Sequence, residues 1–219
     1  MTAPAYRERL PAGEPDGLLV LHHGRGTDEH DLLPLAELLD PQRRLHVVTP
    51  RAPLQLPGSP GHHWYVVARV GFPDPDSFRA SYDLLGEFHA ELWRRTGVTA
   101  ERTVLGGFSM GAVMSYALAL GGGRPVPAGV LALSGFIPTV EGWQASLDDR
   151  RELATLIAHG SEDPVIDVAF ARAARDVLRG AGLGVDYLEF AGGHEIDPLL
   201  LPKMRAWLDA RLPAATQRA

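Results

Sequence analysis

The chain has 219 residues, of which 45% are hydrophobic and 22% charged, and its net charge is −6 at pH 7. This balance is typical of a globular protein and argues against a nucleic-acid-binding surface, which needs clustered basic side chains. The sequence has no cysteine and a single lysine, Lys203, which excludes disulfides, thiolate catalysis and lysine-based mechanisms.

We expect one domain over residues 1–219, with about 1–15 and 213–219 at its periphery. Residues 1–20 contain three prolines and scattered charges rather than the apolar run of a secretion signal. No later run is long enough to span a bilayer. A cytoplasmic location without stable membrane insertion is therefore the expectation.

Short apolar strand runs alternate with helical patterns along the chain. In order, the expected elements are a strand at 18–21, a helix at 28–39, a strand at 45–48, a helix at 75–96, a strand at 103–107, a helix at 109–120, strands at 129–133 and 153–159, a helix at 167–179, a strand at 185–190 and a helix at 198–212. Loops are expected at 49–61 and 137–147, and a short strand or pocket wall at 64–67. Because the strand runs are continuously apolar, they predict an α/β fold with a mostly parallel sheet covered by helices on both faces.

The most informative stretch is Gly106–Gly111, which contains the pattern G-x-S-x-G with Ser109 at its centre. A strand run precedes it and a helical pattern follows, so Ser109 is expected on a sharp strand-to-helix turn. Side chains at Gly107 and Gly111 would collide with neighbouring elements. Such a turn exposes the serine oxygen at the tip of the sheet, beside the N–H groups of the helix. A glycine-rich turn with a surface serine is the alternative interpretation.

A serine hydroxyl needs a base, usually histidine, and the base needs an acid that fixes its tautomer. In a parallel sheet both partners must lie in loops after later strands, because the carboxyl ends of the strands meet at one edge. Asp163 and His194 follow two successive late strands, which gives the order Ser, Asp, His expected of α/β-hydrolases. Glu162 and Asp167 compete for the acidic role, and Asp167 also suits the start of the next helix.

Attack on a carbonyl also needs backbone donors for the resulting oxyanion. We expect these donors to be the N–H of Met110, at the strand-to-helix turn, and the N–H of Arg25, in a glycine-flanked turn. For the turn that contains Arg25, the alternative interpretation is a glycine turn without a role in catalysis. The histidine pairs at 22–23 and 62–63 lack metal-ligand spacing and no H-E-x-x-H occurs, so neither a metal nor a cofactor is expected.

An apolar acyl pocket is expected beside the serine. Five side chains in or near loops are expected at its rim: Trp64, Phe72, Phe136, Trp143 and Val165. Core packing is the alternative for each. Because the sequence has no room for a long lid, short or medium acyl esters are favoured over long lipids.

Five motifs support a family resemblance when they are taken together. They are H-G-R-G at 23–26, G-F-S-M-G at 107–111, L-S-G at 133–135, H-G-S-E-D-P-V-I at 159–166 and G-H at 193–194. This set resembles the phospholipase/carboxylesterase family of α/β-hydrolases, which includes acyl-protein thioesterases and small bacterial carboxylesterases. The resemblance covers about residues 18–212 and implies an α/β-hydrolase fold without a large cap domain. It also implies Ser109 as nucleophile, Asp163 as acid, His194 as base, and Arg25 and Met110 as oxyanion donors.

Two departures separate the chain from the thioesterase branch, which usually carries Leu at the position of Arg25 and has a different loop around Trp64. The closer resemblance is to bacterial carboxylesterases, so we expect a serine carboxylester hydrolase acting on small-molecule esters. The alternatives are a thioesterase or lysophospholipase with the same residues, a dienelactone-hydrolase-like enzyme or peptidase, and a non-catalytic binding protein. Family members are often homodimers, which leaves a homodimer open.

Overall fold

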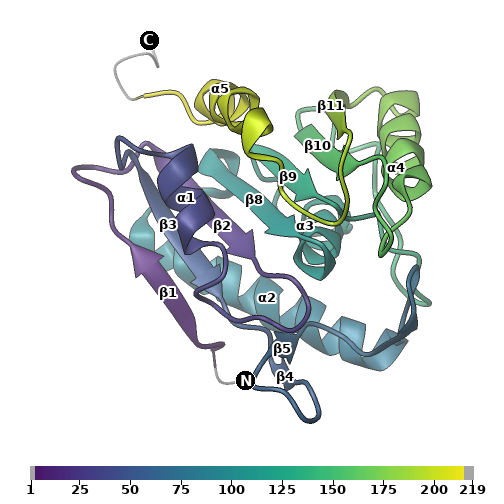
Figure 1. Ribbon diagram of the computed structural model, residues 1–219. Coiled ribbons are helices and arrows are strands. Elements are labelled where there is room, and N and C mark those ends of the chain that lie inside the picture. Colours follow the sequence, from purple (N-terminus) through teal and green to yellow (C-terminus); the bar gives the residue numbers. More distant parts are fainter. Residues whose placement is uncertain (1–2, 215–219) are drawn as a thin grey trace.

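The computed structural model describes residues 3–214, so residues 215–219 of the expected C-terminal tail lie outside the described part. The main sheet has seven strands in the order β1-β3-β2-β8-β9-β10-β11 (Figure 1). These strands are β1 (Tyr6–Arg9), β2 (Gly17–His22), β3 (Leu45–Pro50), β8 (Thr103–Phe108), β9 (Gly129–Leu133), β10 (Ala154–Gly160) and β11 (Gly184–Phe190). Only β1 runs antiparallel to its neighbour in this sheet, and the other pairs are parallel.

Helices connect these strands, and short elements line the loops. The helices are α1 (Leu33–Leu39), α2 (Pro75–Thr96), α3 (Met110–Leu120), α4 (Val168–Gly180) and α5 (Leu201–Arg211), with 3-10 turns η1 (Ala100–Arg102) and η2 (Pro198–Leu200). Two small antiparallel pairs join β4 (Leu54–Gln55) to β5 (His62–His63) and β6 (Val67–Arg69) to β7 (Phe72–Pro73). No helix in residues 3–214 combines the length and apolar character needed to cross a membrane.

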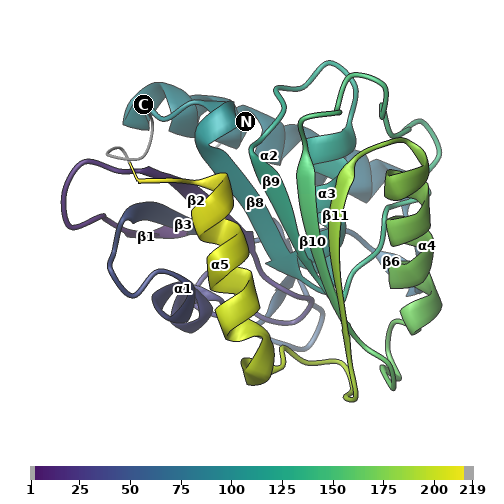
Figure 2. The same cartoon turned by 90° about the horizontal axis from the view of Figure 1, so that it is seen from above.

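Alternate residues of the central strands face two separate hydrophobic clusters, because successive strand side chains point to opposite faces of a sheet. Leu18 and Val20 of β2 belong to the cluster that includes α2, α3 and α4. Leu19 and Leu21 of the same strand belong to the cluster that includes α1 and α5. Figures 1 and 2 show α1 and α5 on one side of the sheet and α2 and α3 on the other. The expected parallel sheet with helices on both faces is therefore confirmed.

The edge strand β1 lies in the segment expected to be peripheral. Its Arg9 is buried, and the guanidinium donates to the Asp40 carbonyl oxygen at 2.9 Å while it pairs with the Asp40 carboxylate. The ring of Tyr6 packs on Phe88, with 5.3 Å between ring centroids. Side-chain contacts over long sequence separations hold this strand, which is why a local apolar pattern does not predict it.

Helix α1 is shorter than the predicted helix at 28–39, since it begins at Leu33. Pro34 lies in its first turn, where a missing N–H is tolerated, but a helix starting at residue 28 would place this proline in its interior. The Asp28 carboxylate instead accepts the N–H of His30 at 2.9 Å and closes a separate turn. The predicted final helix is likewise divided into η2 and α5.

Four parallel strands bring the candidate residues to one edge of the sheet. Arg25 follows β2, Ser109 follows β8, Asp163 follows β10 and His194 follows β11. Because the strands are parallel, the loops at their carboxyl ends lie together, as expected for a ligand-binding edge.

Candidate active site

Ser109 lies between β8 and α3 with φ 55° and ψ −121°, a left-handed conformation that is unusual for a residue with a side chain. Its N–H donates to the Leu133 carbonyl oxygen of β9 at 2.8 Å, which ties the turn to the sheet. A Cβ at Gly107 would lie 2.4 Å from the carbonyl carbon of Gly111, and one at Gly111 would lie 1.9 Å from the His22 carbonyl oxygen. The expected steric need for glycine at both positions is confirmed.

A chain of two hydrogen bonds joins three predicted site residues. Nε2 of His194 lies 2.9 Å from the Ser109 hydroxyl, and Nδ1 of His194 lies 2.7 Å from Oδ2 of Asp163. Ser109 and Asp163 are buried, whereas the His194 ring is half-buried. The geometry allows the imidazole to take a proton from the serine while its other nitrogen remains bonded to a carboxylate.

Both carboxylate oxygens of Asp163 are engaged. Oδ1 accepts the N–H groups of Val165 at 2.8 Å and Ile166 at 2.9 Å, while Oδ2 accepts from His194. Burial alone would raise the pKa of Asp163, but the His194 hydrogen bond and the two backbone donors outweigh it and lower the pKa. The carboxylate therefore stays ionised at neutral pH and favours the His194 tautomer with its proton on Nδ1.

The two competing acids have other surroundings. Asp167 caps α4, since its carboxylate accepts the Ala169 N–H at 2.8 Å. Glu162 is exposed, and no hydrogen bond between its side chain and another residue occurs in the part of the chain that the structure describes. Of the three acids, the structure brings Asp163 to the histidine.

The two expected oxyanion donors are the N–H groups of Met110, at the start of α3, and Arg25, after β2. Within residues 3–214, no carbonyl accepts a hydrogen bond from either amide. Both Arg25 and Met110 line one cavity with Ser109. Two residues that line the cavity with Ser109 thus have backbone N–H groups without a carbonyl acceptor among the described residues, which is compatible with the expected oxyanion site.

His23 supports the Arg25 amide and is absent from the predicted site residues. Its Nε2 accepts the Ala52 N–H at 3.0 Å, so its Nδ1 carries the proton and donates to the Gly24 carbonyl oxygen at 2.7 Å. Burial lowers the pKa of His23, which keeps the ring neutral. In a trans peptide the C=O of Gly24 and the N–H of Arg25 point in opposite directions, so this anchor turns the amide away from His23.

A cavity of about 220 Å³, here called the apolar cavity, adjoins Ser109 and His194. Two of the five residues expected in an acyl pocket, Phe136 and Val165, line it. Four further lining residues have apolar or aromatic side chains: Tyr65 and Val67, which fall in the segment 64–67 expected as a short strand or pocket wall, and Val70 and Ile166, which the sequence interpretation did not select. Its volume is below that of typical small-molecule pockets, which is about 300–1,000 Å³. The cavity therefore suits a small acyl group.

The other three predicted pocket residues lie elsewhere. Trp64 is fully buried, and its Nε1–H donates to the His23 carbonyl oxygen at 2.9 Å. Phe72 is 58% exposed beneath the Arg69 guanidinium, which lies 3.7 Å from the ring centroid. Trp143 packs edge-on against Phe78 and shares a separate cavity of about 80 Å³ with it. None of these three side chains lines the apolar cavity.

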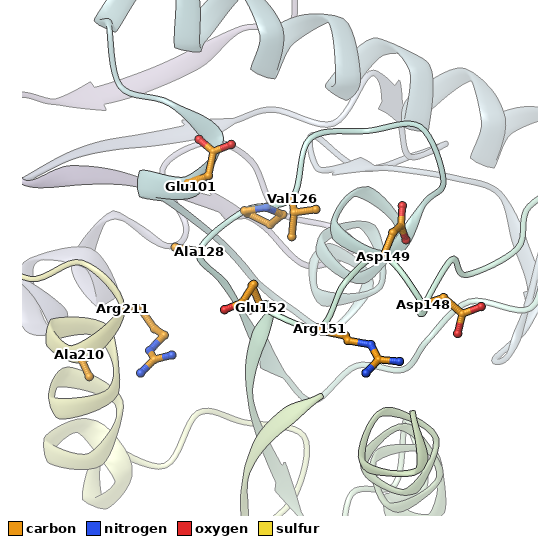
Figure 3. A pocket seen from close by; sticks show the side chains of 10 residues that line it. Glu101, Val126, Ala128, Asp148, Asp149, Arg151, Glu152, Ala210 and Arg211 are labelled. Atoms are coloured by element: carbon orange, nitrogen blue, oxygen red, sulfur yellow. The ribbon is translucent and has the colours of Figure 1, made fainter. Parts of the chain in front are cut away.

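A larger cavity of about 550 Å³ lies at the opposite end of the strands. Figure 3 shows its charged side chains, among them Glu101, Glu152, Arg151 and Arg211. Glu101 precedes β8 and Glu152 precedes β10, so this cavity borders the amino ends of the strands. It holds no serine or histidine in its lining, and the chemistry described above is confined to the other end.

One cluster has the residue types of a metal site, namely Asp28, Glu29 and His30, whose ligand atoms lie within 4.8 Å of one another. The Arg51 guanidinium binds both Glu29 carboxylate oxygens, and His30 lies 3.1 Å from Asp28. These ion pairs account for the cluster as part of the structure of the loop before α1.

Comparisons with known proteins agree with this geometry. The family model described as phospholipase/carboxylesterase matches residues 9–212. The chain belongs to this family. It is therefore an enzyme, a serine hydrolase of the carboxylesterase type with the α/β-hydrolase fold, as the sequence predicts.

Individual members of the phospholipase/carboxylesterase family are distant in sequence. The esterase YpfH of Escherichia coli is 32% identical over 82% of this chain and 76% of its own length. Acyl-protein thioesterase 1 of Gibberella zeae is 28% identical over 92% of this chain and 93% of its own. Among solved structures, a carboxylesterase from Mesorhizobium loti superposes with a TM-score of 0.81 at 25% identity, covering 93% of both chains. Esterase PE8 gives 0.80 at 26% identity, covering 95% of this chain and 99% of its own.

Proposed function

We propose that the enzyme cleaves short- to medium-chain acyl esters of small molecules through Ser109, His194 and Asp163, with a covalent acyl-enzyme intermediate. The observation that carries the proposal is the hydrogen-bonded series from Ser109 Oγ through His194 to Asp163, beside the apolar cavity. We also propose a cytoplasmic location and a single domain.

The acylation step follows from the positions of the protons. Ser109 Oγ attacks the ester carbonyl as Nε2 of His194 takes its proton, and Asp163 stabilises the imidazolium that forms. The amides of Met110 and Arg25 donate to the oxyanion of the tetrahedral intermediate. The imidazolium then gives its proton to the leaving alcohol, which leaves the acyl group on Ser109.

Deacylation repeats the same steps with water in place of the serine. His194 takes a proton from a water molecule, the resulting hydroxide attacks the acyl carbonyl, and the proton returns to Ser109 Oγ as the acid departs. The apolar cavity holds the acyl chain, and its volume of about 220 Å³ is the reason to favour short and medium chains.

The test is hydrolysis of 4-nitrophenyl esters from acetate to palmitate by the wild-type protein and Ser109→Ala. We expect turnover to peak at short or medium chains and Ser109→Ala to lower kcat by about 10⁴-fold or more. Ser146→Ala, at a serine bonded to Asp149 outside the site, is the matched control and should retain full activity. Full activity of folded Ser109→Ala would overturn the proposal.

A second candidate is a thioesterase with the same residues, because acyl-protein thioesterase 1 of Gibberella zeae matches nearly the whole chain. A matched pair, 4-nitrophenyl butyrate and butyryl-thiocholine, compares kcat/KM for oxyesters and thioesters. A higher value for the thioester would favour this candidate. Labelling of Ser109 by a fluorophosphonate without turnover of either ester would point to another acyl substrate, and absence of labelling to a binding protein.

A further inference from the structure

Arg25 extends an exposed side chain at the point where three hollows meet. It lines the apolar cavity, an open hollow of about 400 Å³ that also contains Ser109 and His194, and a groove of about 480 Å³. This last hollow, here called the Arg25 groove, is lined mainly by residues 53–57 and residues 63–67. The guanidinium is therefore close to any substrate whose ester lies at Ser109.

No carboxylate lines the apolar cavity or the Arg25 groove, and Arg25 makes no ion pair or side-chain hydrogen bond with residues 3–214. His63, also in the groove, is kept neutral because burial, and then the Arg25 charge, lower its pKa. The 400 Å³ hollow does contain two acids, but Asp31 accepts from the Thr27 hydroxyl at 3.1 Å and the Glu195 carboxylate lies beside Gly192.

An exposed guanidinium without an acidic partner is available to bind an anion, and the apolar walls beside it weaken the screening by water on the side that faces the hollows. Its planar group of donors fits a carboxylate or a phosphate in a two-point hydrogen bond. The contrast with Arg51 is informative, since the Glu29 carboxylate binds that guanidinium at two points and leaves it little capacity for a ligand.

We propose that the physiological ester carries a carboxylate or phosphate group, and that the Arg25 side chain binds this group while the carbonyl lies at Ser109. The inference rests on the proposed function and adds the substrate class to it. Since Arg25 also supplies the proposed oxyanion amide, the anion and the ester carbonyl must lie within about one arginine side chain of each other. A half-ester of a short dicarboxylic acid, or an ester of a small acidic alcohol, meets this condition.

The test compares esters that differ in one charge. The acyl-side pair is mono-4-nitrophenyl glutarate and 4-nitrophenyl valerate. The alcohol-side pairs are 4-butyryloxybenzoate and its neutral amide for carboxylate, and 4-butyryloxyphenyl phosphate and its neutral dimethyl ester for phosphate. In each pair the ratio of kcat/KM, anionic over neutral, is measured for the wild type, Arg25→Gln, Arg25→Lys and the control Arg69→Gln.

We expect one pair to give a wild-type ratio of about ten or more, which identifies the anion and its side of the ester. In Arg25→Gln this ratio should fall about tenfold, mainly through KM, and in Arg25→Lys it should fall less. Raising the salt concentration should also lower it. The exposed Arg69, stacked on Phe72, should leave the ratio unchanged when replaced.

Two results would overturn the inference alone. One is Ser109-dependent hydrolysis with every anionic-to-neutral ratio at or below one. The other is an equal loss for neutral and anionic esters in Arg25→Gln, which would assign the side chain to the chemical step instead. If no ester is cleaved at all, the proposed function fails, and calorimetric titration of Ser109→Ala with the glutarate half-ester still decides the inference. Absence of binding, or binding unaffected by the further change Arg25→Gln, would then overturn it.

Discussion

At the scale of single residues, Asp163 is the most constrained group in the site. Its two oxygens accept two backbone N–H groups and the His194 imidazole, and a buried histidine, His159, lies 3.3 Å from Oδ2. His159 donates its own Nε2 proton to the Ile166 carbonyl oxygen at 2.8 Å. The loop after β10 thus positions the carboxylate before any substrate arrives.

Asp163→Asn should lower kcat by about 10⁴-fold at pH 7–8, because an amide NH₂ directed at Nδ1 would favour the tautomer that cannot accept the serine proton. Steady-state kinetics with a 4-nitrophenyl ester measures the loss. Glu162→Gln, one residue earlier and exposed, is the matched control and should keep wild-type kcat. If the two variants lost activity equally, Asp163 would not be the acid of the series.

At the scale of elements, β1 shows how an edge strand is held by one buried ion pair. Asp40, at the end of α1, binds the Arg9 guanidinium and also accepts the N–H groups of Arg44 and Leu45 at 2.9 Å each. The same carboxylate thus connects β1, the end of α1 and the beginning of β3.

Asp40→Ala should lower the free energy of unfolding by about 3–5 kcal/mol, since it removes the buried carboxylate partner of Arg9 and the acceptor of two backbone N–H groups. Urea denaturation followed by circular dichroism measures the change. Glu37 lies 3.5 Å from the same guanidinium but is exposed, so Glu37→Ala should cost about 1 kcal/mol or less. Equal losses in both variants would contradict this account of β1.

At the scale of the whole molecule, a buried histidine pair makes stability depend on pH. His22 of β2 and His89 of α2 are both buried, with 3.4 Å between their Nε2 atoms. Burial, and secondarily the Arg124 charge, lower the pKa of His89 to about 3, and burial also lowers that of His22. Because the unfolded chain takes up protons near pH 6.5, stability is complete above that pH and is lost as the pH falls toward 3.

We expect His89 to lower the free energy of unfolding by about 2 kcal/mol between pH 7 and pH 5, and His22 to add to the fall in the same direction. His89→Leu removes one titrating group and should reduce this fall, as urea denaturation at several pH values would measure. Identical pH profiles for the wild type and His89→Leu would contradict the assignment.

The proximity of Ser109, Asp163 and His194 could be predicted because each follows an apolar strand run, and parallel strands bring their carboxyl ends together. The helix at Pro75–Thr96 was predictable for a similar local reason, since Asp74 caps its start and Gly97, with φ 70°, ends it. In both cases the residues that allow the prediction lie within a few positions of the element or site residue that they predict. The catalytic roles of the three site residues stay a proposal.

The features that escaped prediction depend on contacts between distant residues. The strand β1 is held by a pair 31 residues apart in sequence, and its alternating charges do not resemble a buried strand. The direction of Trp64 is fixed by a hydrogen bond to the His23 carbonyl oxygen, which no local pattern encodes. His23 belongs to the H-G-R-G motif, but its supporting role could not be predicted, because that role depends on hydrogen bonds with the Ala52 and Gly24 backbone groups.

The placement of Arg25 also has a consequence for how this enzyme can evolve. In the proposed mechanism the residue contributes its backbone amide to catalysis, whereas its side chain faces the hollows around the substrate. Every amino acid except proline provides that backbone N–H. Substitutions at position 25 can therefore change which esters are preferred without removing the donor, so this position can adapt to a new substrate by a single mutation, and proline is the one residue that selection should exclude there.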